Sequence, residues 1–154
     1  MGFFSWWNKL VTDTPNSVVV DTDFVTKSIK AISPNCIVDD EYSHFLCFSE
    51  ISLINFVEKY HDNSYITYGA DAPDFPLCYD FAQLCEADIR KGAIKEGLKE
   101  RPAFGVLRYT RHDCRHAINF AVLMTGKIKY FEPQSQNQFM DIPEDLVSLD
   151  NFFI

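Results

Sequence analysis

The feature that most constrains the fold of this 154-residue chain is a change of hydrophobic period close to Pro102. Before Pro102, apolar residues recur at helical spacing, first over about 50–60 and again from Phe81 to Ile89. After it, residues 117–124 form a nearly continuous apolar run, Thr125-Gly126 predicts a tight turn, and residues 127–131 alternate, which is typical of a β-hairpin. Helices followed by an antiparallel sheet predict an α+β fold.

The charge balance limits the kinds of partner. The chain carries 14 Lys and Arg against 22 Asp and Glu, a formal net charge of −8. A protein that binds nucleic acid through phosphates needs a clustered basic surface, so we expect no nucleic-acid partner. The 47% hydrophobic content suits a real core. We therefore expect an aromatic N-terminal segment over residues 1–17 and a single domain over 18–154.

The N-terminal segment is rich in aromatic residues, namely Phe3, Phe4, Trp6 and Trp7. It either packs on its own domain or contacts a protein or a membrane surface. The stretch is too short to span a bilayer and lacks the basic start and cleavage site of a signal peptide. The five cysteines are odd in number and form no compact framework, which favours free thiols and a cytoplasmic location.

Cys78 is the strongest candidate for chemistry. It stands where an irregular acidic segment, 61–76, gives way to a helical pattern, and a helix N-terminus lowers the pKa of a thiol. His116 begins an apolar strand, and Glu132 ends the strand that follows the turn. In such a set Cys78 is the nucleophile, His116 accepts the thiol proton, and Glu132 orients the imidazole.

Three further residues are predicted to support this site. Asp80 falls in the first helical turn, where a carboxylate is stabilising. Asn119 and Gln134 are candidates to hold the site by hydrogen bonds, and Gln134 is also a candidate donor to an oxyanion.

Two other patterns lie close to His116. His112, Cys114 and His116 form a His-x-Cys-x-His cluster that could bind zinc together with Cys78 or Cys85, although no Cys-x-x-Cys pair supports it. Arg108, Arg111 and Arg115 form a small basic spot, which either binds an acidic group or is a solvated turn.

Three short blocks carry a family resemblance: Cys78-Tyr-Asp-Phe-Ala82, His116-Ala-Ile-Asn119 and Phe131-Glu-Pro-Gln134. In this order they resemble the papain-like cysteine protease domain of the fairy-ring mushroom agglutinin and its bacterial and phage relatives. The resemblance implies a papain-like fold, with the nucleophile at a helix start packed on a C-terminal antiparallel sheet. It implies Cys78, His116 and Glu132 as the catalytic residues of a cysteine peptidase or related acyl transferase.

The same resemblance implies a peptide or protein substrate, a host-cytoplasmic location if a phage encodes the chain, and a calcium-dependent activity. Calcium is not required for the thiol chemistry itself, and Leu77 and Tyr79 replace acidic residues of the family pattern, as Arg115 replaces a glycine. These departures favour the alternative hypothesis, a catalytically silent papain-like binding module that engages a host or virion protein.

Overall fold

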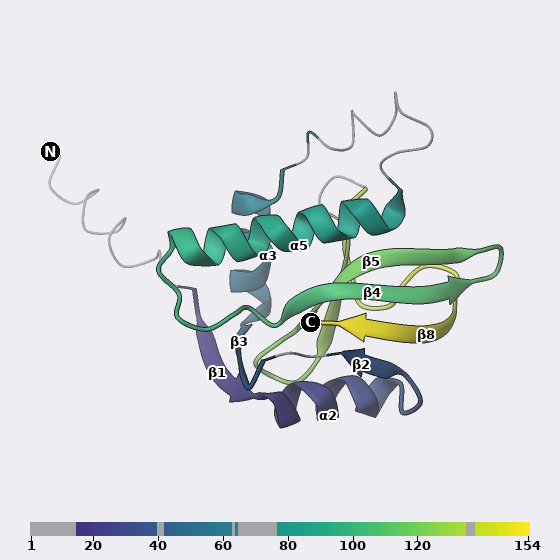
Figure 1. Ribbon diagram of the computed structural model, residues 1–154, viewed down its shortest axis with the longest axis horizontal. Helices are drawn as coiled ribbons and strands as arrows, with labels where there is room; N and C mark the ends of the chain where they lie inside the picture. The colour runs from purple at the N-terminus through teal and green to yellow at the C-terminus, as the bar shows by residue number, and fades with distance from the viewer. Residues whose placement is uncertain (1–14, 40–41, 63, 65–76, 135–137) are drawn as a thin grey trace, which may run out of the picture.

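The computed structural model of the chain describes residues 15–39, 42–62, 64, 77–134 and 138–154 (Figure 1). In the described residues the helices are α2 (Thr22–Ile32), α3 (Glu50–Tyr60) and α5 (Cys78–Lys95). The strands are β1 (Ser17–Asp21), β2 (Ile37–Asp39), β3 (His44–Phe48), β4 (Phe104–Arg111), β5 (Arg115–Val122), β6 (Ile128–Glu132), β7 (Gln138–Met140) and β8 (Leu146–Phe153).

The helices begin where local chemistry favours it. The Asp21 carboxylate accepts the Phe24 N–H at 2.9 Å, and the Ser49 hydroxyl accepts the Ser52 N–H at 3.3 Å, so both caps satisfy an otherwise unpaired backbone donor. The sequence prediction of a helix over about 50–60, capped at Ser49, is confirmed. The predicted hairpin around Gly126 is confirmed as well, with β5 and β6 antiparallel.

The main sheet of the described residues has six strands in the order β2-β8-β4-β5-β6-β7, and β1 pairs with β3 in a separate two-stranded ribbon (Figure 1). Strand β8 lies inside the main sheet, antiparallel to β4 on one side and parallel to β2 on the other. The last strand of the described chain is therefore an interior strand, and it joins the N-terminal β2 to the C-terminal hairpin.

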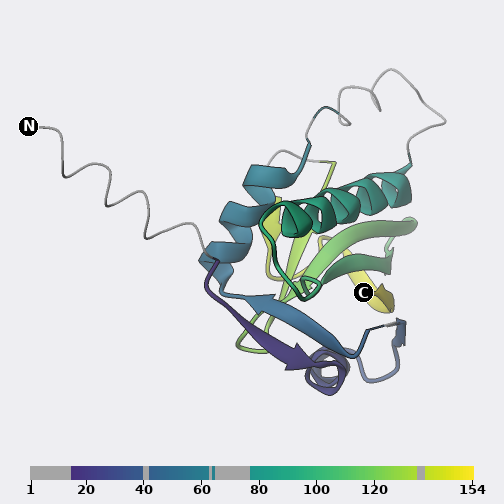
Figure 2. The ribbon, with the colours of Figure 1, turned by 60° about the vertical axis from the view of Figure 1, so that its left-hand side comes forward.

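Helices cover both faces of this sheet, as the two views show (Figures 1 and 2). On one face, Val25 and Ile29 of α2 pack with Leu107, Ile118 and Phe120. On the other face, α5 and α3 pack on the sheet through a second set of buried residues, which includes Phe56, Cys85, Ile89, Phe104 and Ala121. Because both faces of β5 are buried, its sequence reads as a continuous apolar run instead of an alternating one.

The expected papain-like α+β arrangement, with N-terminal helices first and a C-terminal antiparallel sheet second, is wrong. Strands β1 and β2 flank the first helix, and β2 pairs in parallel with β8, so the main sheet is mixed and draws on both ends of the described chain. Strands β4 and β5 contribute buried residues to the cores on both faces of the sheet. Sequence period alone missed this, since it carries no information on which distant strands pair.

Among the described residues, none of the helices combines the length and the apolar character needed to cross a membrane.

Candidate functional site

Cys78 is the first residue of α5, as the sequence predicts. Leu77 before it is extended, and its N–H donates to the Asp80 carboxylate at 2.8 Å, so Asp80 steadies the first helical turn. The Cys78 thiol is half-buried and packs beside Ala82 and Ala117, between the helix and β5. The first turn of α5 therefore presents the thiol toward β5.

His116 and Glu132 meet across the β5–β6 hairpin. The His116 imidazole lies 2.7 Å from the Glu132 carboxylate, measured from Nε2 to Oε2, and their side chains are 10% and 14% exposed. The same imidazole lines one pocket together with the Cys78 thiol, and Tyr109 packs edge-on against its ring. With Nε2 engaged by Glu132, Nδ1 is left for the thiol. The structure thus brings together the three residues that the sequence predicts.

The electrostatics of this cluster favour a charged pair. The hydrogen bond with His116 lowers the pKa of Cys78, against the opposing effect of burial, and the backbone N–H groups of Ala117 and Tyr79 lower it further. Burial lowers the pKa of His116, but the hydrogen bonds and charges of Cys78 and Glu132 outweigh it and raise the value to about 9. Both shifts act in the same direction, because each stabilises the thiolate–imidazolium pair relative to the neutral thiol and imidazole.

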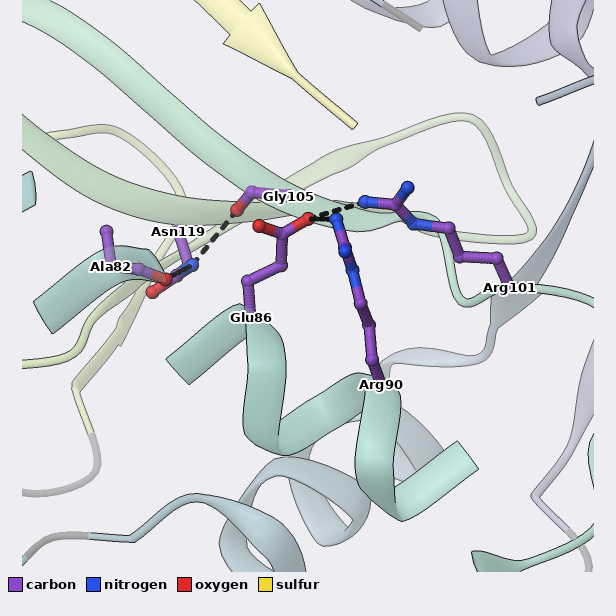
Figure 3. Close-up of polar contacts among 6 residues, drawn as sticks. All are labelled: Ala82, Glu86, Arg90, Arg101, Gly105 and Asn119. Carbon is purple, nitrogen blue, oxygen red and sulfur yellow. Dashed lines mark hydrogen bonds and ion pairs between the residues drawn. The ribbon is translucent and has the colours of Figure 1, made fainter. Parts of the chain in front are cut away.

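Asn119 positions the helix, not the imidazole. Its amide nitrogen donates to the carbonyl oxygens of Ala82 and Gly105, at 2.8 and 3.1 Å, and its side chain is completely buried (Figure 3). Asn119, on β5, therefore ties α5 to the neighbouring strand β4. Gln134 contributes its backbone, whose N–H donates to Oε1 of Glu132 at 3.0 Å.

A second polar contact fixes the middle of α5. Glu86 accepts hydrogen bonds on one carboxylate oxygen from Arg90 and from Arg101, at 2.6 and 2.5 Å (Figure 3). Arg101 precedes β4, so this contact joins the helix to the entry of the sheet.

The thiol opens into a pocket of about 230 Å³, whose lining consists of Cys78, Tyr79, Arg108, Arg115, His116 and Ala117. The Arg108 guanidinium lies over the Tyr79 ring, 4.0 Å from its centroid, and 5.5 Å from that of Phe153. Arg115 forms an ion pair with Asp150 at 3.5 Å, and its side chain is 73% exposed. The pocket therefore combines a thiol, an imidazole and two guanidinium groups.

The basic spot predicted from sequence is divided by the structure. Arg108 and Arg115 line the pocket, whereas Arg111 turns to Asp145 at 3.4 Å. No sequence signal indicates that Tyr79 packs against Arg108, because the two residues lie on different elements, α5 and β4.

Two further sequence predictions concern a zinc site and the aromatic N-terminal segment. No group of three or more His, Cys, Asp or Glu side chains suited to a metal ion occurs in the described part of the chain, so the zinc alternative around His112 and Cys114 finds no support there. The aromatic residues Phe3, Phe4, Trp6 and Trp7 lie outside the described residues.

Comparisons with known proteins add a likeness of fold. No family model and no curated protein matches the chain. Among solved structures, a crystal structure of Polyporus squamosus lectin bound to the human-type influenza-binding epitope Neu5Acα2-6Galβ1-4GlcNAc matches with a TM-score of 0.66 and 13% identity, over 88% of this chain and 49% of that one. PSL1a in complex with E64 matches with a TM-score of 0.61 and 16% identity, over 88% of this chain and 51% of that one. The chain thus spans about half the length of the solved chains it matches.

This likeness corrects the functional prediction. The resemblance to a papain-like cysteine protease, and with it the predicted peptidase or acyl-transfer activity, is overturned, because the matching solved structures are lectins. The alternative that the sequence left open, a binding module, agrees better with the comparison, although its kind differs from the papain-like one expected.

Proposed function

We propose that this chain is a binding module whose pocket at the start of α5 receives a carboxylate-bearing segment of a protein partner. The observation that carries the proposal is Arg108. Of the five arginines, Arg90, Arg101, Arg111 and Arg115 each form an ion pair with a carboxylate, and Arg108 alone has none within the described residues. It lies instead in the pocket, with its guanidinium carbon 4.0 Å from the centroid of the Tyr79 ring.

The position over the Tyr79 ring makes Arg108 a suitable anchor for an anion. A guanidinium that lies over an aromatic ring can still direct N–H groups to a carboxylate in a planar, bidentate hydrogen bond. Arg115 lines the same pocket, but its guanidinium is paired with Asp150, so Arg108 supplies the unpaired cation of this pocket. In a chain with a net charge of −8, Arg108 therefore forms a local site for negative charge on an otherwise acidic molecule.

The lining favours a peptide over a sugar. The lectin that matches in fold is bound to a sialylated epitope, which also carries a carboxylate. Sugar hydroxyls, however, need several polar side chains that both donate and accept, and this lining holds no Asn, Gln, Asp or Glu. An acidic side chain of an extended peptide needs only the guanidinium edge and space beside it.

The test is a binding titration followed by NMR of the ¹⁵N-labelled protein. We expect an acetylated peptide with one Glu among Ala residues to shift the amides of Cys78, Tyr79 and Arg108, and its Gln analogue to shift them much less. Arg108→Gln should weaken the Glu peptide about tenfold, whereas Arg111→Gln, which removes a guanidinium outside the pocket, should not. Equal binding of the Glu and Gln peptides contradicts the proposal, and preferential binding of Neu5Acα2-6Galβ1-4GlcNAc would assign the pocket to a glycan.

A second proposal concerns the chemistry of the same pocket. We propose that Cys78 is a nucleophilic thiolate, with His116 as its proton acceptor and Glu132 as the group that orients the imidazole. The lowered pKa of Cys78 and the 2.7 Å His116–Glu132 contact support it. Such a thiolate can form a covalent bond with an electrophilic group of a bound ligand.

Site-resolved alkylation with iodoacetamide tests this second proposal, and the chain provides its own control. Cys114 is exposed, but the neighbouring Asp113 raises its pKa, whereas Cys78 is half-buried with a lowered pKa. We expect Cys78 to react faster than Cys114 at pH 6–7, and His116→Ala to remove the difference. Because one matching structure is a complex with E64, that compound is a second probe for Cys78. Faster reaction at Cys114 throughout this range would sink the idea.

A further inference from the structure

A groove adjoins the pocket on the side of β8. It has a volume of about 620 Å³ and lies between the end of α2 with the turn that follows it, 32–37, and residues 146–151. Arg115 lines both this groove and the pocket that holds Cys78, so the two hollows meet at one side chain. A ligand seated in the pocket can therefore continue into the groove.

The groove contains a strand edge without a strand partner. On the side away from β4, β8 pairs with β2 only through Asn151, Phe152 and Phe153. Residues 146–150 of β8 have no strand on that side within the described part of the chain. The Ser33 hydroxyl donates to the Leu149 carbonyl at 3.1 Å, which satisfies one group of this edge. Unpaired strand edges accept an extended peptide as an additional strand.

Half of the residues that line this groove are apolar, and three of their side chains are well exposed. Ile32, Ile37 and Val147 line the groove and are 47%, 60% and 56% exposed. Large aliphatic side chains grouped in a concave surface are typical of a docking site, whereas single exposed ones are ordinary. At the far end the groove reaches the Arg115–Asp150 ion pair, where its character changes from apolar to charged.

We propose that the partner is an extended peptide segment in which an acidic residue occupies the Arg108 pocket and alternate apolar residues lie in the β8 groove. The inference rests on the proposed function, because the pocket fixes where the acidic residue is bound. Extended geometry follows from the strand edge, and alternation follows from the two-residue period of side chains along a strand. The apolar residues of the peptide would determine specificity, while its acidic residue would fix the position of the peptide along β8.

Three acetylated, amidated heptapeptides separate the contributions of the pocket and the groove. The first has a central Glu among Ala residues, the second adds Val at alternate positions on both sides of that Glu, and the third is the second with Gln in place of Glu. Each is titrated by calorimetry into the wild type, Val147→Lys and Ile51→Lys. Ile51 is 74% exposed on α3 and does not line the groove, so Ile51→Lys controls for the introduced charge.

We expect the second peptide to bind the wild type about tenfold more tightly than the first, because two buried Val side chains supply that difference. The gain should disappear in Val147→Lys and persist in Ile51→Lys. Equal affinity of the first two peptides, or a gain that persists in Val147→Lys, contradicts binding of apolar residues in the groove and leaves the pocket proposal unaffected. If the second and third peptides bind equally, the pocket does not bind the acidic residue, and the groove proposal is unaffected. Absence of binding by all three overturns both.

Discussion

At the scale of single residues, the charge state of the Cys78 site depends on partners from three elements. Cys78 comes from α5, His116 from β5 and Glu132 from β6. The chain order and the strand ends predicted all three from sequence. Gln134 differs, because its backbone N–H and not its amide reaches Glu132. Sequence patterns identify side chains, and they do not show which backbone group a turn will expose.

Glu132→Gln tests how the cluster is charged. Removing the carboxylate takes away one of the two groups that raise the pKa of His116 to about 9, so that pKa should fall. A less basic imidazole stabilises the thiolate less, and the pH at which Cys78 alkylation is half-maximal should rise by about one unit. The measurement is the alkylation rate from pH 5 to 9. An unchanged profile would show that Glu132 does not act through His116.

At the scale of elements, α5 is stabilised by contacts that its own sequence does not predict. Gly92 lies inside the helix, where glycine is ordinarily destabilising, yet α5 runs unbroken to Lys95. The reason is space, because a Cβ on Gly92 would stand 2.5 Å from the Tyr60 ring of α3. The glycine therefore permits the close approach of α3 and α5, and Tyr60 in turn hydrogen-bonds Glu96 beyond the end of the helix.

Gly92→Ala should consequently destabilise the protein. Alanine ordinarily improves a helix interior by about 0.5–1 kcal/mol, but here the overlap with Tyr60 forces the helices apart at a cost of about 1–3 kcal/mol. We expect a net loss of about 1 kcal/mol in the free energy of unfolding, measured with urea. Adding Tyr60→Ala should reverse the sign of the Gly92→Ala effect. A stabilising single substitution would contradict the close contact.

Asn119→Leu tests the tie between α5 and β4. The substitution removes both donors from the buried carbonyls of Ala82 and Gly105, so we expect a loss of about 2–3 kcal/mol in urea unfolding. Cys78 alkylation should also slow, because the helix start is no longer fixed against the sheet. Stability within about 0.5 kcal/mol of the wild type would show that these bonds are easily replaced.

At the scale of the whole molecule, acid sensitivity should have a contribution from His61. This side chain is buried beside Phe131, and burial lowers its pKa below 6.5, against the attraction of Asp88 at 3.9 Å. As the pH falls through 6.5 the unfolded chain binds the proton more readily than the folded one, so stability decreases. His116 contributes no slope there, since its raised pKa makes its contribution complete below 6.5.

His61→Gln should therefore lose less stability than the wild type between pH 6.5 and 5. The measurement is the free energy of urea unfolding at several pH values in this window, compared between the two proteins. Identical slopes would show that His61 titrates alike in the folded and unfolded states.

The sequence by itself determined the local elements and the order of the site residues. Helical periods, the Ser49 cap and the Thr125-Gly126 turn are short-range signals, and so is the placement of Cys78 at a helix start. Only the tertiary structure decided that β8 enters the sheet between β2 and β4, which makes the sheet mixed and overturns the expected papain-like order. The tertiary structure alone also placed the Tyr79 ring against Arg108. It likewise placed Arg115 where the Cys78 pocket and the β8 groove meet. Pairing of distant strands depends on how the whole chain buries its apolar faces, and no local period records it.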